Sequence, residues 1–211
     1  MGLAETILVC AGENRATGFT RDAAVAMLAQ VGHPQFEQPY GGLIPGYYAM
    51  VARRYMHEYG TTRAQLASVA VNTRAHALLN PTAQMKTPLT AEQVLSSKLI
   101  ADPLRMLDCC IISDAAGAFI VTSAERATGL RNKPVYLWGI GEKHTHEHLV
   151  CAPSLTHFGA HDSGRTAYEM AGVGPQDVDF AHPFARVLHQ PFHIFHAGCI
   201  RHGDLNGGIL R

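Results

Sequence analysis

The sequence lacks an excess of charge of either sign and holds few charged residues altogether. Lysine and arginine together number 17, aspartate and glutamate also number 17, and charged residues fill 16% of the 211 positions. Without a net positive field, the chain has no long-range attraction to nucleic acid or to anionic lipid. A 47% share of hydrophobic residues instead fits a compact α/β protein with a sizeable core.

The sequence also lacks a long apolar run and a basic leader. "TILVCAG" (6–12) is too short to span a membrane and no basic region precedes it, so we expect neither a transmembrane helix nor a signal peptide. The cysteine count is odd and the spacing does not repeat, which is atypical of a disulfide-stapled secreted domain: Cys10, Cys109, Cys110, Cys151 and Cys199. We therefore expect reduced thiols and a cytoplasmic location.

Strand and helix patterns alternate along the chain, without internal repeats. Apolar runs predict buried strands at 6–12, 108–123 and 133–143, with another strand beginning at 177–182. Helical patterns cover 21–32, 43–60, 61–81, 94–100 and 161–174, with a short helix after Ser123. Capping residues are expected at Thr61 or Thr62, at Gly60, and in a Thr90–Gln93 capping box. Because 13–107 has no strand signal, we expect an α/β layered fold with a largely helical insertion between strands.

Four segments follow one another along the chain: "GLAETILVCAGEN", "PYGGLIPGYYAMVARRYMHEYGTTRAQLASVAV", "NPTAQMKTPLTAEQVLSSKLIADPLRMLDCCIISDAAGAFIVTSAERA" and "AGVGPQDVDFAH". Taken in this order, they resemble the thiolase superfamily, specifically the thiolases of the sterol-carrier or lipid-transfer type. The resemblance implies part of a layered αβαβα fold that is usually dimeric. It divides the chain into the end of an amino-terminal thiolase half with its helical loop region (1–130), the start of the carboxyl-terminal half (131–182), and a non-homologous or divergent tail (183–211).

The chemistry implied by this resemblance is that of an acyl-CoA C-acyltransferase or a related carbon–carbon lyase in lipid metabolism. A cysteine thiolate takes the acyl group as a thioester, and preorganised donors hold the enolate. The thioester of coenzyme A is then the substrate, and no other cofactor is expected. Acetyl-CoA acetyltransferases belong to this family.

None of the family's catalytic positions carries over onto this sequence. The nucleophilic cysteine would precede Met1, and Cys10 lies in an apolar run where a thiol is ordinarily inert packing. Phe184 and Ala185 occupy the places of the family's His-Asp or Tyr-Asp pair, and His182 falls two positions early. The Gly-His-Pro loop would lie beyond Arg211. We therefore expect a chain truncated at both ends and inactive alone, with no catalytic residue and no cofactor-binding residue assigned.

A histidine-rich stretch near the end, "HQPFHIFHAGCIRH", raises the question of a metal site. His189, His193, His196, Cys199 and His202 would line one face of a helix, and histidine with cysteine is a plausible zinc set. Pro191 argues against that helix because it would remove an interior hydrogen bond. A tail without evolved function, a divergent strand and loop, and a zinc site remain as alternatives, in that order, so no metal is expected.

Four other groups receive structural interpretations. His144, His146 and His148 alternate, with Cys151 on the other face of a strand, but we favour a solvated loop over a metal site. The small residues of "ISDAAGA" (112–118) indicate tight strand-to-helix packing rather than a phosphate-binding turn. Asp108 and Asp114 are interpreted as capping or turn groups. Core spacing is predicted for the four tyrosines of the second helix, with the lining of an acyl tunnel as a secondary possibility: Tyr47, Tyr48, Tyr55 and Tyr59.

Three functions follow as hypotheses. The first is a thiolase-like acyltransferase or lyase acting on an acyl-CoA, as a homo-oligomer or together with a missing thiolase half. The second is a non-catalytic subunit of a split thiolase, or a partner of a small acyl-CoA-binding subunit with an OB fold. The third is a zinc-binding module. Neither nucleic acid nor a membrane is expected as a partner.

Overall fold

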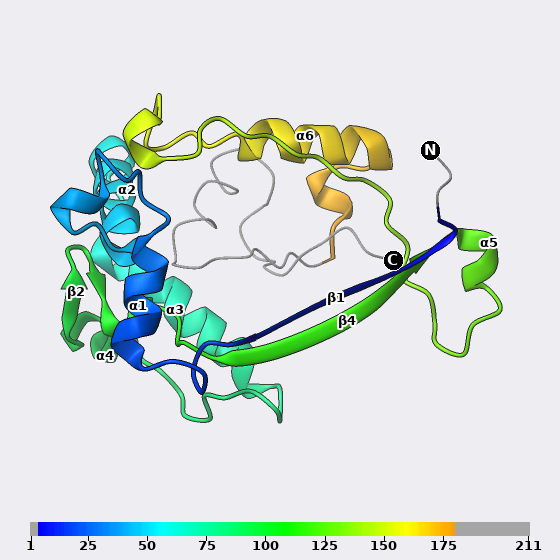
Figure 1. Cartoon of the computed structure of the whole chain (residues 1–211), viewed down its shortest axis with the longest axis horizontal. Helices are drawn as coiled ribbons and strands as arrows, with labels where there is room; N and C mark the ends of the chain where they lie inside the picture. The colour runs from blue at the N-terminus through cyan, green and yellow to red at the C-terminus, as the bar shows by residue number, and fades with distance from the viewer. Residues whose placement is uncertain (1–3, 180–211) are drawn as a thin grey trace.

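The computed structural model describes residues 4–179 as a long two-stranded ribbon with most of the helices at one end and a short helix at the other (Figure 1). Its strands are β1 (Thr6–Asn14), β2 (Leu99–Ala101), β3 (Leu104–Arg105) and β4 (Asp114–Thr122). Its α-helices are α1 (Arg21–Ala29), α2 (Ile44–Tyr59), α3 (Arg63–Leu78), α4 (Ala91–Ser96), α5 (Ala124–Ala127) and α6 (Ala160–Ala171). Single 3-10 turns are η1 (Gln38–Tyr40), η2 (Met106–Asp108), η3 (Leu149–Cys151) and η4 (Pro175–Asp177). The α/β class is confirmed.

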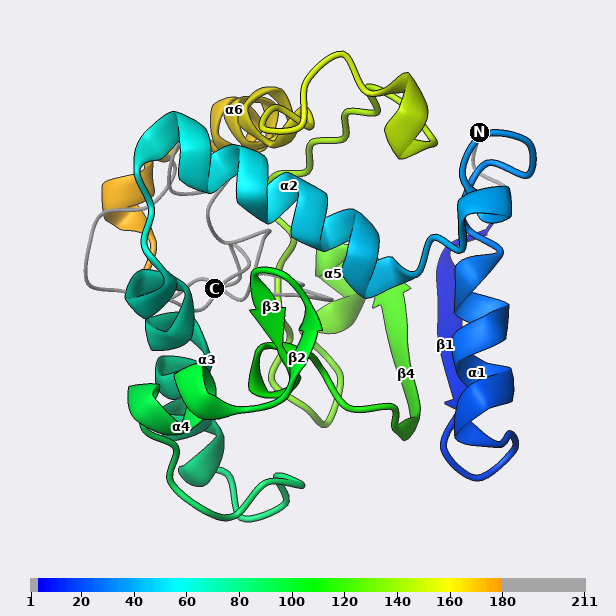
Figure 2. The same cartoon turned by 90° about the vertical axis from the view of Figure 1, so that its left-hand side faces the viewer.

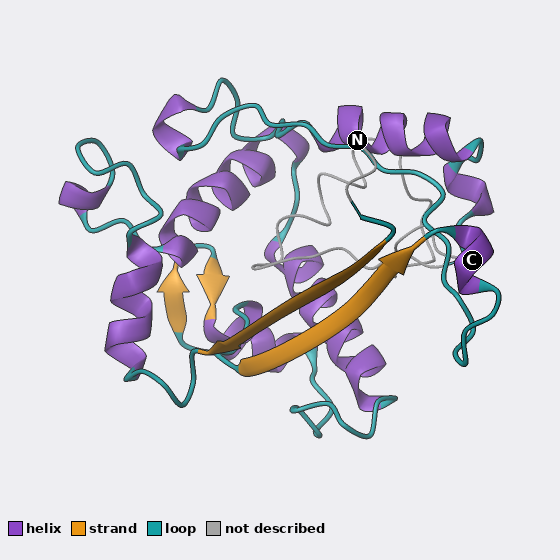
Figure 3. Cartoon of the chain, turned by 45° about the vertical axis from the view of Figure 1, so that its right-hand side comes forward, coloured by secondary structure: helices purple, strands orange, loops and turns teal. Residues whose placement is uncertain are grey.

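The ribbon is an antiparallel pair of β1 and β4, in register from Thr6 opposite Thr122 to Asn14 opposite Asp114. The strand predicted at 6–12 is confirmed, but its predicted burial is wrong, since all nine residues of β1 are exposed. Its apolar side chains point to both faces because successive residues of a strand alternate. No element of the described part of the chain covers either face, and Figure 3 shows the ribbon standing apart from most of the helices.

The segment between the two strands is helical, as the absence of strand signals predicted. Helices α1 to α4 occupy it, with a short hairpin of β2 and β3 that the sequence patterns missed (Figure 2). Local signals set the boundaries: Thr62, rather than Thr61, caps α3 together with Gln65, and the capping box of Thr90 is present at α4. Gly60 ends α2 in the left-handed conformation (φ 66°), which glycine adopts without strain.

The buried core lies in this helical region and includes two small clusters. One joins Ala49 and Ala52 of α2 to Leu104 of β3. The other joins Ala67 and Ala70 of α3 to Val94 of α4. These alanines let the helices approach closely, and Leu104 and Val94 fill the space between them. The first cluster holds α2 against the β2–β3 hairpin, and the cavity described below lies beside the start of this helix.

Other strand predictions need correction. Of the strand predicted at 108–123, only Asp114–Thr122 forms, so residues 114–118 of "ISDAAGA" lie within β4 rather than in a strand-to-helix contact or a phosphate-binding turn. Residues 133–143 contain only an isolated bridge at Leu137, because the segment packs on α6 instead of on a strand. A Cβ on Gly139 or Gly141 would lie 2.1 Å from the Ala167 carbonyl oxygen or 1.9 Å from that of Ser163.

Two remaining expectations concern the carboxyl-terminal part and the membrane. The turn η4 replaces the start of the strand predicted at 177–182, and residues 180–182 lie outside the described part. Within residues 4–179, no helix combines the length and apolarity needed to cross a bilayer. The predicted division of the chain at 130 and 182 stays a prediction.

Candidate functional site

An apolar cavity of about 620 Å³ lies beside the start of α2. The connection between α1 and α2 forms one side, the first turns of α2 a second, β2 a third, and the segment around η3 the last. Its apolar walls include Phe36, Tyr40, Leu43, Tyr47, Met50, Ile100, Leu149, Val150 and Leu155. Ligand-binding cavities of proteins commonly have this size and apolar character, with few polar groups to orient the ligand.

One acidic side chain, Glu37, takes part in the wall of the cavity, and it is 9% exposed. Its Oε2 accepts a hydrogen bond from the backbone N–H of His33 at 2.7 Å, and its Oε1 accepts one from the backbone N–H of Val150 at 2.6 Å. Both oxygens therefore have donors, which offsets the cost of burying the carboxylate. Glu37 thus joins two segments that lie 113 residues apart in the sequence.

The phenol of Tyr47 lies between two glycines beside the same cavity. A Cβ on Gly32 would lie 2.2 Å from the Tyr47 hydroxyl oxygen, and a Cβ on Gly42 would lie 2.1 Å from it. Any larger residue at either position must displace the ring. The hydroxyl is buried and has no hydrogen-bond partner among the described residues, and its pKa is raised, first by burial and then by the charge of Glu37.

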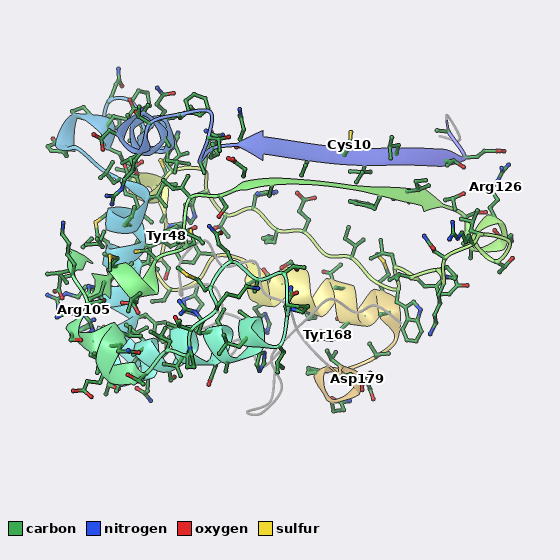
Figure 4. The ribbon with its side chains drawn as sticks, turned by 90° about the horizontal axis from the view of Figure 1, so that it is seen from below. Cys10, Tyr48, Arg105, Arg126, Tyr168 and Asp179 are labelled. Carbon is green, nitrogen blue, oxygen red and sulfur yellow. The ribbon has the colours of Figure 1, made fainter. Side chains whose placement is uncertain are left out.

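Of the four tyrosines predicted to share core spacing, only Tyr47 reaches the cavity. Tyr55 is buried and its ring centroid lies 4.5 Å from that of Tyr59, so these two pack on each other. Burial raises the pKa of Tyr55, with the neighbouring Tyr59 as the second cause. Tyr48 packs against the core cluster of Ala49, Ala52 and Leu104 (Figure 4). Of the four tyrosines, Tyr47 alone can therefore line an acyl-binding cavity. The prediction of core spacing is confirmed for Tyr55.

The described cysteines do not line the cavity. Cys10 is exposed on the outer side of β1, which corrects the expectation of a buried thiol (Figure 4). Cys109, by contrast, has a pKa raised to about 11, first by burial and then by the charges of Asp108 and Cys110. A thiol with so high a pKa is a poor nucleophile at neutral pH. Cys199 lies outside the described residues.

The histidines at 144–148 lie in a loop rather than on a strand, so they share no strand face. His144 is exposed, His146 packs on Phe158 at 5.3 Å between ring centroids, and His148 meets His33 edge to face at 5.0 Å. Nowhere in residues 4–179 do three or more histidine, cysteine, aspartate or glutamate side chains gather closely enough to hold a metal ion. His182, Phe184, Ala185 and the histidine stretch 189–202 lie outside the described part.

Both aspartates singled out in the sequence serve as capping or turn groups, as predicted. Asp108 Oδ2 accepts a hydrogen bond from the backbone N–H of Arg105 at 2.8 Å, and burial is the chief reason that its pKa is raised. Asp114 accepts hydrogen bonds from the backbone N–H groups of Ala16 and Thr17. Neither residue lies at the cavity.

Sequence reasoning missed Glu37, the pair of glycines around Tyr47, and the cavity itself. The stretch "HPQFEQPYGG" does carry a signal, because a lone carboxylate sits among aromatic residues and turn formers. Its partner Val150 could not be found in this way, because nothing local relates two residues so far apart in the chain.

Comparison with known proteins identifies the family. A model of the "Thiolase C-terminal domain-like" family matches residues 141–194. The acetyl-CoA acetyltransferase of Methanothermobacter thermautotrophicus is 38% identical over 174 residues, which cover 82% of this chain and 45% of that protein. The chain belongs to the thiolase superfamily. The resemblance seen in the sequence is thereby confirmed.

Solved structures agree with this assignment. The "Ltp2-ChsH2(DUF35) aldolase" superimposes with a TM-score of 0.79 at 31% identity, covering 95% of this chain and 53% of that one. A monomeric SCP2-thiolase-like protein from Mycobacterium smegmatis has the same fold, with a TM-score of 0.66 at 20% identity over 93% of this chain and 43% of that one. The expected partial thiolase fold of the sterol-carrier type is confirmed. The chain spans about half the length of the curated relatives that it matches.

Proposed function

We propose that this chain provides the acyl-binding part of a thiolase-superfamily acyltransferase or carbon–carbon lyase that acts on CoA thioesters. The observation that carries the proposal is the cavity beside α2, which has room for an acyl chain and is lined almost entirely by apolar side chains. Each methylene moved from water into such a site contributes about 0.8 kcal/mol. The cavity therefore favours a bulky acyl group over an acetyl group.

The described residues suit binding better than bond cleavage. The carboxylate of Glu37 is already satisfied by two backbone donors, and no described thiol lies in the cavity wall. In this proposal the thiolate that carries the acyl group comes from another part of the protein or from a partner chain. No cofactor besides the coenzyme A of the substrate is required, and the proposed location is the cytoplasm.

Binding of octanoyl-CoA by the whole chain, measured by isothermal titration calorimetry, tests the proposal. Met50 lines the cavity yet is 49% exposed, so Met50→Glu should leave the fold intact while placing a charge against the acyl chain. We expect its affinity for octanoyl-CoA to fall at least tenfold. Met85→Glu is the matched control, because Met85 is 38% exposed and does not line the cavity. Equal affinities for both variants would refute the proposal.

A second candidate function is that of a subunit that pairs with another thiolase-superfamily chain. The exposed apolar pairs Ile7–Val121, Leu8–Ile120 and Val9–Phe119 favour it, because both faces of a two-stranded ribbon are then apolar. Replacing Leu8 and Ile120 with serine should abolish co-purification with a full-length thiolase chain expressed beside it. Retention of that chain by the doubly substituted ribbon would count against this candidate.

A further inference from the structure

One short segment, residues 148–156, forms part of the cavity wall and lies beside α2. We call it the strap; it contains η3 and supplies Leu149, Val150 and Leu155 to the cavity wall. In Figure 1 this segment is drawn in yellow and reaches the helical end of the molecule beside α2. Most of the remaining wall belongs to residues 36–50. The position of the strap thus decides how much of the cavity an acyl chain can fill.

A carboxylate holds the strap near its first end. Glu37 Oε1 accepts the hydrogen bond of the Val150 N–H at 2.6 Å, while Oε2 is kept in place by the N–H of His33 at 2.7 Å. The glutamate is buried, so water competes little for these donors. Beside it the ring of His148 meets that of His33.

A second carboxylate holds the strap at its other end. The Thr156 hydroxyl donates a hydrogen bond to Glu58 Oε2 at 2.7 Å, and Thr156 is only 4% exposed. Glu58 is in the last turn of α2 and also binds Arg54, one turn earlier, at 2.5 Å. The pKa of Glu58 is lowered, first by the hydrogen bond from Thr156. The two carboxylates therefore lie before α2 and at its end, and the strap runs between them.

We propose that Glu37 and Glu58 are positioning residues that set the acyl-size preference of the cavity by fixing the strap at two points. The first point is at Val150, next to Leu149, and the second is one residue after Leu155, so each carboxylate acts on the wall residues beside it in the strap. Releasing one point lets Leu149 and Val150 move away from the ligand. A long acyl chain then loses contacts that an acetyl group never makes. This inference rests on the proposed function of the cavity.

The first arm of the test follows the strap itself. Hydrogen–deuterium exchange with mass spectrometry on the whole chain reports the protection of peptides that contain Val150. In Glu37→Gln, one of the two N–H donors faces an amide NH₂ group instead of a carboxylate, so we expect these peptides to exchange roughly tenfold faster. Peptides of α3 should be unchanged, which separates release of the strap from general unfolding.

The second arm measures the affinity for octanoyl-CoA relative to acetyl-CoA. We expect the ratio of the affinity for octanoyl-CoA to that for acetyl-CoA to fall about tenfold in Glu37→Gln. Weakening a hydrogen bond to a charged acceptor changes an equilibrium constant by about this factor. A smaller fall is expected in Thr156→Val, which keeps the shape of the side chain and removes its hydroxyl. Glu142→Gln is the matched control: Glu142 lies in the loop before the strap, is exposed, and contacts His144 rather than the strap. Its ratio should equal that of the unsubstituted chain.

The outcomes separate the two proposals. If the unsubstituted chain shows no preference for octanoyl-CoA, the proposed function fails, and the positioning roles fail with it. If the preference exists but is unchanged in Glu37→Gln and Thr156→Val, the cavity binds acyl groups and the inference about the strap is wrong. An equal loss of affinity for both ligands would indicate a purely structural role and would also overturn the inference. A lower ratio with faster exchange at Val150 supports it.

Discussion

The Asp114 carboxylate accepts a hydrogen bond from the backbone N–H of Ala16 at 2.7 Å, although the two residues are 98 positions apart. The same oxygen accepts the N–H of Thr17 at 3.2 Å. One side chain at the first residue of β4 thus fixes the chain where it leaves β1. The register of the ribbon and the start of the helical segment are set at the same point.

This contact predicts a dependence of stability on pH. The pKa of Asp114 is lowered from 3.8, first by a hydrogen bond from the Thr17 side chain and then by that of the Ala16 N–H. A lowered pKa in the folded state stabilises the protein above pH 3.8, and this contribution is lost as the pH falls through the lower, folded value. The free energy of unfolding of Asp114→Asn should therefore decline less steeply below pH 4. Urea titrations at several pH values measure this, and parallel curves would contradict the prediction.

The glycines around Tyr47 predict a specific rescue. Gly32→Ala brings a Cβ to 2.2 Å from the Tyr47 hydroxyl oxygen but leaves 3.1 Å to its ring carbon Cζ. We expect a loss of about 1–3 kcal/mol in the free energy of unfolding, as for other overpacked sites. Tyr47→Phe removes the clashing oxygen, which has no hydrogen-bond partner to lose among the described residues. It should restore most of the loss in the double variant, measured by urea denaturation.

Two control substitutions test whether the Tyr47 hydroxyl is the atom that clashes. Gly42→Ala brings its Cβ to 2.4 Å from Cζ of the same ring, so Tyr47→Phe should not rescue it. Gly46→Ala, in α2, meets no atom within 4 Å and should be neutral or more stable by up to about 1 kcal/mol, because alanine favours a helix. Equal rescue of Gly32→Ala and Gly42→Ala would show that the hydroxyl is not the atom in conflict.

Thiol reactivity should follow exposure and pKa. With a pKa of about 11, Cys109 is thiolate in only about one molecule in a thousand at pH 8, whereas Cys10, Cys110 and Cys151 are exposed. Iodoacetamide at pH 8 should therefore modify those three well before Cys109. Mass spectrometry of the labelled peptides gives the order, and early labelling of Cys109 would contradict it.

The cap of α3 predicts how replacing each of two neighbouring threonines changes the free energy of unfolding. Thr62 accepts the N–H of Gln65 at 3.3 Å, and Gln65 in turn accepts the Thr62 N–H at 2.7 Å. Thr62→Ala should lower the free energy of unfolding by about 1 kcal/mol. Thr61→Ala, one residue earlier and outside the cap, should change it by a few tenths at most. Urea denaturation of both variants distinguishes them, and equal losses would argue against the cap.

Local signals in the sequence predicted the helical part of the fold well. Thr90, Gly60 and Ser123 act on their own immediate neighbours, so their caps and stops can be recognised one segment at a time. The family resemblance succeeded for another reason, because it compares ordered segments along most of the chain.

Features that depend on distant partners were missed or misjudged. The run 133–143 has the composition of a strand, but a strand needs a neighbour, and Gly139 and Gly141 instead let it pack closely on α6. The apolar neighbours of Cys10 in the sequence predict a buried thiol. Burial, however, depends on whether another element covers the strand, and Cys10 is exposed. The cavity depends on Glu37 meeting Val150, a contact that no local pattern encodes.

The pairing of β1 with β4 also bears on how the chain folds while it is being made. Thr6 and Thr122 are opposite each other in the ribbon and are 116 residues apart in the sequence. At typical rates of translation, β1 waits on the order of ten seconds on the ribosome before its neighbour emerges. During that interval the apolar side chains of β1 can bind chaperones or other nascent chains. The yield of folded protein should therefore respond more to the supply of chaperones than to any substitution in α3.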